Sequence, residues 1–275
     1  MEKRAKRSAN GVPYTSSTPL RLAAKQQALY REVLALFERA RCPYAVAGAF
    51  ALREHTGICR LTKDLDIFLS PPDASDALAR LQEHGFECEL CDPVWLAKAR
   101  RNGYFVDLIT GMSNGVISVD DSWIVRARPA SILGVKTRVL APEELLASKL
   151  FVTRRERFDG ADIAHIIFVS RGALQWDRIL LLAGEHWELV LWALVLFRYV
   201  YPAHSNYVPQ SLWQDLLARF AEEVRRPNPS ARFRGSLIDD AMFAIDVEEW
   251  GLDDVLKEHQ ARSAKIAPPP VSRCA

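Results

Sequence analysis

The stretch Tyr44–Leu69, YAVAGAFALREHTGICRLTKDLDIFL, decides the fold of this chain. Its first part, 44–49, is apolar and contains Gly48, which indicates a short buried strand that ends in a glycine turn. A helical pattern then begins at Phe50. The apolar residues 65–69 indicate a second strand, which a Ser-Pro-Pro sequence ends. The stretch therefore predicts a strand, a turn, a helix and a strand.

The same patterns extend in both directions from this stretch. Residues 20–40 carry apolar side chains at a spacing of three or four, which predicts a helix, and 73–84 is a second amphipathic helix. Strands are predicted at 104–109 and 135–139. Helical patterns dominate afterwards, at 143–152, 161–169, 176–183, 187–201 and 212–224. We therefore predict an α+β domain with a small mixed sheet and flanking helices, followed by a helical C-terminal domain.

The predicted organisation has four parts. A basic tail at 1–19 and a proline-rich tail at 266–275 are expected to be disordered. Between them, the α+β domain is predicted at 20–145 and the helical domain at 146–265.

Composition excludes several classes of protein. Hydrophobic residues make up 49% and charged residues 25% of the 275 residues, which excludes a disordered, collagen-like or coiled-coil chain. The 36 basic and 34 acidic residues nearly cancel, so any nucleic-acid surface is a local patch. The apolar run 189–200 is shorter than a membrane span and is interrupted by Arg198, so we expect a buried helix and no membrane association.

The five cysteines indicate a reduced, cytoplasmic protein, because their number is odd and no secretory leader is recognisable. Cys88 and Cys91 form a single Cys-x-x-Cys, with His84 as the only histidine nearby. We interpret these cysteines as structural, and redox or metal binding is the alternative for this pair.

Three carboxylates stand on or beside predicted strands. Asp64 and Asp66 are two residues apart, so an extended strand directs both to one face, about 6–7 Å from each other. Asp107 interrupts an otherwise apolar strand. Three converging acids repel unless cations neutralise them, and oxygen ligands suit Mg²⁺. The alternative is that Asp64 and Asp66 cap the strand or face water.

Gly48 is a candidate for phosphate binding. Without a side chain there, the backbone can approach a phosphate closely, and the following helix directs its first N–H groups at the anion. An ordinary strand-to-helix turn is the alternative.

Together these residues resemble the signature of the polymerase-β nucleotidyltransferase superfamily. That signature is a strand, a glycine turn, a helix, Asp-x-Asp on the next strand and a third acid on a later strand. Gly48, Asp64, Asp66 and Asp107 match it.

The Arg-x-Thr-x-Asp-x-Asp form, with Arg60 and Thr62, is similar to the AbiEii-type abortive-infection proteins. These are bacterial proteins and are often the toxin of a toxin–antitoxin pair. Ala49 departs from the superfamily pattern, in which many catalytic members carry Gly or Ser. Only its backbone N–H is available to a phosphate.

A second segment, 142–167, supports the same resemblance. Lys149 matches a family lysine on a helix, and Arg157, Asp159 and Asp162 match a later Arg-x-Asp-x-x-Asp element. The resemblance implies that Lys149 contacts the nucleotide phosphates. The alternative is a solvated helix face whose cations pair with Asp159 and Asp162.

The resemblance implies an Mg²⁺-dependent nucleotidyltransferase. It would transfer a nucleoside monophosphate from an NTP to a hydroxyl and release pyrophosphate by a two-metal mechanism. Asp64 and Asp66 would hold two Mg²⁺ ions. Asp107 would complete the second metal site and help to deprotonate the acceptor. The nucleotide-binding residues implied are Gly48, Ala49, Arg60, Thr62, Lys149, Arg157 and Asp162.

The acceptor stays open among a tRNA end, a protein hydroxyl and a small molecule such as an aminoglycoside. One alternative is a weakly catalytic or non-catalytic nucleotide- or RNA-binding member of a toxin–antitoxin or phage-defence module, with an antitoxin protein as partner. Another is a nucleic-acid-binding protein that uses the basic segment 149–157.

Overall fold

The structure is a computed structural model that describes residues 22–60 and 62–268. The tail predicted at 1–19 lies outside the described residues, as do residues 269–275 of the second tail. Ile266, near the start of that second tail, is buried, and its N–H donates to the Pro93 carbonyl at 2.8 Å. The last described residues therefore return to the first half of the chain.

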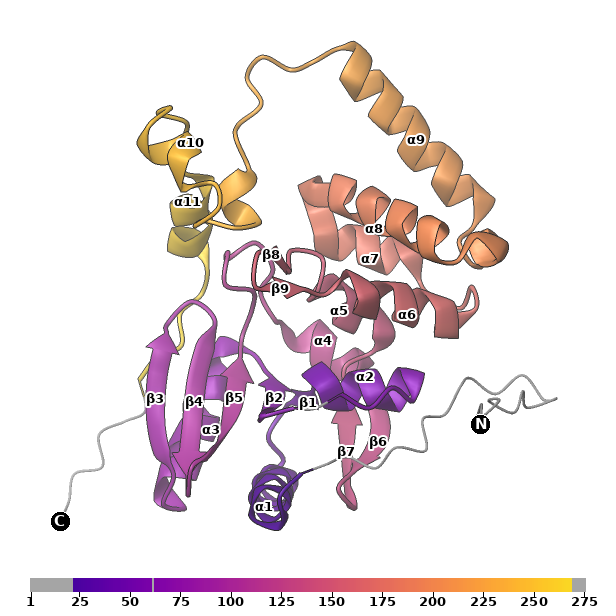
Figure 1. Cartoon of the computed structure of the whole chain (residues 1–275). Helices are drawn as coiled ribbons and strands as arrows, with labels where there is room; N and C mark the ends of the chain where they lie inside the picture. The colour runs from indigo at the N-terminus through magenta and orange to yellow at the C-terminus, as the bar shows by residue number, and fades with distance from the viewer. Residues whose placement is uncertain (1–21, 61, 269–275) are drawn as a thin grey trace, which may run out of the picture.

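A seven-stranded mixed sheet forms the base of the molecule (Figure 1), in the order β3-β4-β5-β2-β1-β7-β6. The pairs β2–β5 and β1–β7 are parallel, and the other four pairs are antiparallel. The strands are β1 (Ala45–Val46), β2 (Asp64–Phe68), β3 (Glu87–Asp92), β4 (Leu96–Arg101), β5 (Tyr104–Ile109), β6 (Arg128–Ile132) and β7 (Val135–Val139). The predicted mixed sheet with flanking helices is confirmed, while β3, β4 and β6 were not predicted.

Four helices accompany the sheet, namely α1 (Ala24–Ala40), α2 (Gly48–Thr56), α3 (Pro71–Glu83) and α4 (Asp121–Arg126). Helices α1 and α3 contact the strands, whereas α2 contacts the sheet on one side and the later helices α5 and α6 on the other. The strand predicted at 44–49 is therefore too long. Its hydrogen-bonded part is β1 alone, because Gly48 takes a positive φ of 54° and already begins α2.

The second half of the chain is mostly helical, as predicted. It contains α5 (Pro142–Ala147), α6 (Gly160–Ser170), α7 (Trp176–Ala183), α8 (Trp187–Val200), α9 (Gln210–Arg225), α10 (Ala244–Glu248) and α11 (Val255–Arg262). Short 3₁₀ turns lie at η1 (Gly184–His186), η2 (Pro202–Tyr207) and η3 (Gly235–Leu237). The predicted boundary at 145/146 falls inside α5.

The helix predicted at 143–152 is wrong beyond Ala147. The chain turns there and forms the hairpin β8 (Thr153–Arg154) and β9 (Arg157–Phe158). The Asp159 N–H donates to the Val152 carbonyl at 3.0 Å and closes this excursion. The turn brings Asp159 back beside Lys149, which a continuous helix would not do.

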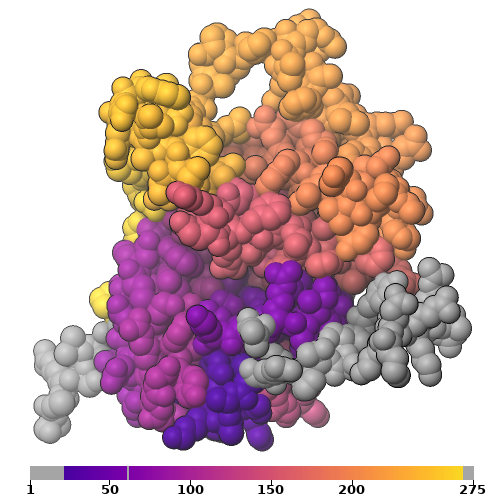
Figure 2. All heavy atoms as spheres, viewed as in Figure 1, coloured from indigo at the N-terminus to yellow at the C-terminus, as the bar shows by residue number. Residues whose placement is uncertain are grey.

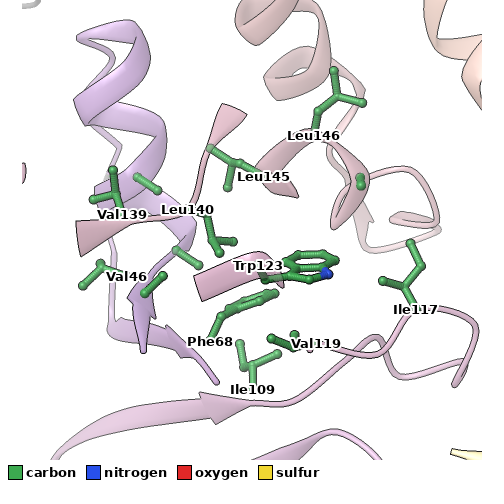
Figure 3. Packing of buried hydrophobic residues seen from close by; sticks show 14 of the residues in the cluster. Val46, Phe68, Ile109, Ile117, Val119, Trp123, Val139, Leu140, Leu145 and Leu146 are labelled. Atoms are coloured by element: carbon green, nitrogen blue, oxygen red, sulfur yellow. The ribbon is translucent and has the colours of Figure 1, made fainter. Parts of the chain in front are cut away.

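A continuous apolar core joins the sheet to the helical half (Figure 3). Trp123 of α4 is fully buried and stacks on Phe68 at the end of β2, with ring centroids 5.9 Å apart. Val46, Leu140 and Leu145 surround this pair. Burying each large apolar side chain contributes about 1.5–3 kcal/mol. The packing therefore fixes the end of β2, two residues beyond Asp66.

The segment Trp176–Val200 is long and apolar enough to cross a membrane, by length and composition alone. In the structure it forms two helices, α7 and α8, which contact each other and are separated at Gly184, where φ is 56° and ψ is −126°. Of its most apolar window, 44% is buried. A pair of core helices meets the same criterion.

Candidate active site

Two parallel strands bring the three predicted acids together. In the pairing of β2 with β5, Asp66 lies directly opposite Asp107. Asp64 precedes Asp66 by two residues, so its side chain lies on the same face of β2. One carboxylate oxygen from each of the three lies within 4.8 Å of the others. The sheet register therefore creates a compact cluster of negative charge.

This crowding changes the ionisation of Asp66. Burial, and then the charges of Asp64 and Asp107, raise the pKa of Asp66 from 3.8 to about 7. Burial likewise raises the pKa of Asp107, although the Lys98 ammonium opposes that rise. The cluster therefore carries more negative charge than the surrounding side chains neutralise.

Lys98 is a site residue that sequence reasoning missed. It lies opposite Asp107 in the β4–β5 pairing, and its Nζ donates to Asp107 Oδ1 at 2.6 Å. The ammonium also lies 4.5 Å from the centre of the Phe105 ring. No sequence signal pointed to it, because Lys and Ala are both uncommon in strands and β4 depends on its pairing with β3 and β5.

Gly48 makes room for Asp66. A Cβ atom at this position would lie 1.7 Å from Asp66 Oδ2, and the φ of 54° is one that other residues rarely adopt. The Asp66 carboxylate consequently rests against the first backbone atoms of α2. Both the space that Asp66 occupies and the positive φ require glycine at this position. These requirements hold whether or not a phosphate binds there.

The opposite wall is a chain of ion pairs. Lys149 is buried, and its Nζ lies 2.6 Å from Asp159 Oδ2 and 2.9 Å from Asp162 Oδ2. The Arg157 guanidinium donates to both oxygens of Asp159, at 3.1 and 3.0 Å. Burial opposes the ionisation of Asp159, but Arg157 and Lys149 outweigh it and lower the pKa of that carboxyl. The Arg157 side chain is nevertheless 65% exposed.

These two walls enclose a cleft of about 340 Å³. It is lined by the backbone of Gly48 and by polar side chains that include the three acids, Lys149, Arg157 and Asp159. Its apolar residues include Phe68, Trp95, Met112, Phe151 and Leu237. The cleft thus offers acidic groups, cations and an apolar surface within one enclosure, which is the usual composition of a small-ligand site.

Four residues predicted for nucleotide binding are not among the described residues that line the cleft: Ala49, Arg60, Thr62 and Asp162. Thr62 Oγ1 donates to Asp64 Oδ1 at 2.8 Å, and Arg60 forms an ion pair with Asp162. In this structure Thr62 orients one of the acids, and Arg60 neutralises a carboxylate that also holds Lys149.

No family model and no curated protein matches the chain. Among solved structures, the antibiotic-resistance factor ANT(2'')-Ia is similar at 15% identity and a TM-score of 0.43, over 66% of this chain and 100% of that one. An antigenic nucleotidyltransferase-like protein from Paracoccidioides brasiliensis is 19% identical, with a TM-score of 0.42, over 69% and 94% of the two chains.

A nucleotidyltransferase-like protein from Thermotoga maritima is 14% identical, with a TM-score of 0.37, over 46% of this chain and 83% of that one. Similarity at this level assigns no function to the chain. What the protein does has to be inferred from the side chains of the cleft.

Proposed function

We propose that this protein is a nucleotidyltransferase that transfers a nucleoside monophosphate from an NTP to a hydroxyl group and releases pyrophosphate. The observation that carries the proposal is the cluster of Asp64, Asp66 and Asp107 at one edge of the cleft. Cations at Lys149 and Arg157 line the same cleft. Such an enclosure matches the charges of a metal-bound triphosphate.

The three acids fit divalent magnesium. All the donors are carboxylate oxygens, which Mg²⁺ prefers, and their oxygens lie close enough to share ions. The pKa of Asp66, raised to about 7, indicates that the cluster lacks counter-charge. Asp64 and Asp66 would hold two ions, and Asp107 would complete one of the two sites. Bound there, the ions would supply Lewis-acid activation of the attacking oxygen and stabilisation of pyrophosphate.

The chain's own groups supply the remaining functions. Arg157 lines the cleft, is largely exposed and can bind a phosphate, while Asp159, itself held by Lys149, keeps it in position. The backbone at Gly48 begins α2 and lines the cleft, where its N–H can donate to a phosphate oxygen. The apolar wall of the cleft, which includes Trp95, can contact the base of the nucleotide and exclude water from it.

Asp107 is the group proposed to receive the proton of the acceptor hydroxyl. Its carboxyl is buried, and Lys98 holds one of its oxygens, so its orientation is fixed. The other oxygen stays available to the cleft. The reaction needs NTPs and Mg²⁺, so a cytoplasmic location belongs to the proposal.

The transfer reaction can be tested without knowing the acceptor. Each of the four NTPs, labelled at the α-phosphate, is incubated with Mg²⁺ and with total RNA, total protein or an aminoglycoside. We expect Mg²⁺-dependent labelling of one acceptor class by the native protein and none by Asp66→Asn. Asp76→Asn, on the exposed face of α3, is the matched control. Equal labelling by the native protein and Asp66→Asn would contradict the assignment.

The second candidate is a weakly catalytic nucleotide- or RNA-binding protein of a toxin–antitoxin or phage-defence module of the AbiEii type. It is favoured by the Lys98 ammonium on Asp107 Oδ1, which competes with a metal ion, and by Ala49, which lacks a hydroxyl. This candidate predicts NTP binding without label transfer to any of the acceptors tested.

A further inference from the structure

A second group of side chains that could hold a metal ion lies outside the proposed active site. Among the described residues two such groups occur, the three aspartates and the set Glu185, His186 and His259. Cys88 and Cys91 belong to neither of them. In the second set, one ligand atom of each residue lies within 4.8 Å of the others.

The three residues come from distant parts of the chain. Glu185 and His186 form the 3₁₀ turn η1 between α7 and α8, while His259 lies on α11. They line a cavity of about 400 Å³ together with residues of the segment that follows α9, namely Asn228, Ser230, Ala231, Arg232 and Arg234. In Figure 2 the orange part of the chain arches away from the body and leaves an opening before the yellow segment of α10 and α11.

We propose that Glu185, His186 and His259 form a binding site for a transition-metal ion of the Zn²⁺ type. His186 is only 5% exposed, and its Nε2 atom is buried without a hydrogen-bond partner. An orphaned buried nitrogen is costly, and a metal ion would satisfy it. Two imidazoles and one carboxylate are a donor set that suits zinc and leaves a fourth position open.

Donor atoms without partners favour a cation at this site. The Glu185 carboxylate makes no hydrogen bond or ion pair with the described residues. Lone pairs on all three side chains are therefore available to an ion.

Two of the three arginines that line the cavity are paired with acids. Arg232 pairs with Glu258 at 2.7 Å and with Asp253 at 3.4 Å, and Arg234 pairs with Glu188 at 3.1 Å. Arg262 forms no ion pair with the described residues, and the Glu185 carboxylate offsets its charge. A phosphate group is therefore the main competitor as ligand.

A metal here would fasten α11 to the junction of α7 and α8. These elements lie far apart in the sequence and meet only in the folded chain, so metal binding stabilises the fold, by an amount that grows with the logarithm of the metal concentration. The site differs from the aspartate cluster in position and in donor chemistry, and it does not depend on the proposed transferase activity.

Zinc content of the full chain tests the proposal. The metal-stripped protein is reloaded with Zn²⁺ in excess Mg²⁺, which occupies oxygen-only sites, and is then desalted and analysed by mass spectrometry for bound zinc. We expect one equivalent in the native protein and in Asp66→Asn. Glu185→Gln and His259→Asn should bind at least about 100-fold more weakly, since even the loss of a partner of a ligand costs 10–100-fold.

Two controls make the outcome decisive. His84→Asn removes a histidine whose ring contacts the Arg80 carbonyl far from the cavity, and it should retain zinc. Co²⁺ in place of Zn²⁺ should give the absorption bands of a four-coordinate site in the native protein and in His84→Asn, but not in Glu185→Gln or His259→Asn. The proposal is overturned if the native protein retains no zinc, if the two ligand variants retain as much as the native protein, or if phosphate and not zinc raises the melting temperature.

Discussion

The charge of Asp66 depends on its burial and on its acidic neighbours Asp64 and Asp107. Its pKa is about 7 in the folded chain and near the ordinary 3.8 in the unfolded one. Between these values the folded protein holds a proton that the unfolded protein has lost. The free energy of unfolding therefore falls as pH rises from about 4 to about 7 and stays lower above that range.

Urea denaturation at about pH 5 and pH 8, in the absence of divalent ions, measures this effect. We expect the native protein to lose more stability than Asp66→Asn between the two values. Mg²⁺ added at the higher pH should restore stability to the native protein only. An identical pH dependence in the two proteins, with Asp76→Asn as the reference variant, would refute the charge crowding.

Gly48 can be tested against a second glycine. Gly48→Ala and Gly103→Ala both place a side chain at positive φ, 54° and 79°, but a Cβ at Gly103 meets nothing within 4 Å. Each variant should lose about 1–2 kcal/mol of stability from backbone strain. Only Gly48→Ala displaces Asp66, so only it should lower the transfer rate, by about 100-fold or more. Equal transfer rates in the two variants would show that Gly48 has no role in the active site.

At the scale of elements, the turn after α5 and the β8–β9 hairpin place two cations differently. Arg157 lines the cleft and is largely exposed, whereas Lys149 is buried, so we expect the first to bind the nucleotide and the second to stabilise the fold. Arg157→Met should weaken NTP binding about 10- to 150-fold, the equivalent of 1.5–3 kcal/mol, and leave nucleoside binding unchanged. Lys149→Met removes one of the two cations that contact each of Asp159 and Asp162, which keep Arg157 and Arg60, so it should cost about 1.5–3 kcal/mol of stability. Binding titrations and thermal unfolding separate the two. A fully stable Lys149→Met with the binding defect would reverse the roles.

The sequence was informative about elements with strong local patterns. The strands at 104–109 and 135–139 and the helix at 176–183 have the predicted bounds. An apolar run defines the first strand, apolar residues at alternate positions define the second, and an amphipathic pattern defines the helix. Strand β4 was missed, since its LAKARR sequence is basic and its residues gain their strand structure from pairing with β3 and β5.

The site was predicted as far as sequence spacing reaches. The convergence of Asp64 with Asp66 follows from a two-residue period, whereas the contact with Asp107 needs the β2–β5 register, which only the family resemblance suggested. The position of Lys98 beside Asp107 could not be predicted, because Lys98 lies on β4, which was itself not predicted. The burial of Lys149 depends on the chain turning back after α5, and no local pattern encodes that turn.

At the scale of the whole molecule, the cleft lies between the sheet and the helical half. The acids come from the sheet, and Lys149 and Arg157 come from the segment after α5. Leu237, on η3, lines both this cleft and the cavity of the proposed zinc site. The proposed zinc site therefore adjoins the cleft through Leu237.

The central claim is that the three acids bind an NTP through divalent metal. Calorimetric titration of the native protein and Asp66→Asn with non-hydrolysable analogues of the four NTPs, with and without Mg²⁺, tests it most directly. We expect the native protein to bind at least one analogue, at least about 10-fold more tightly with Mg²⁺ than without it, and Asp66→Asn to show no such gain. Binding that is independent of Mg²⁺, or an equal gain in Asp66→Asn, would contradict the account.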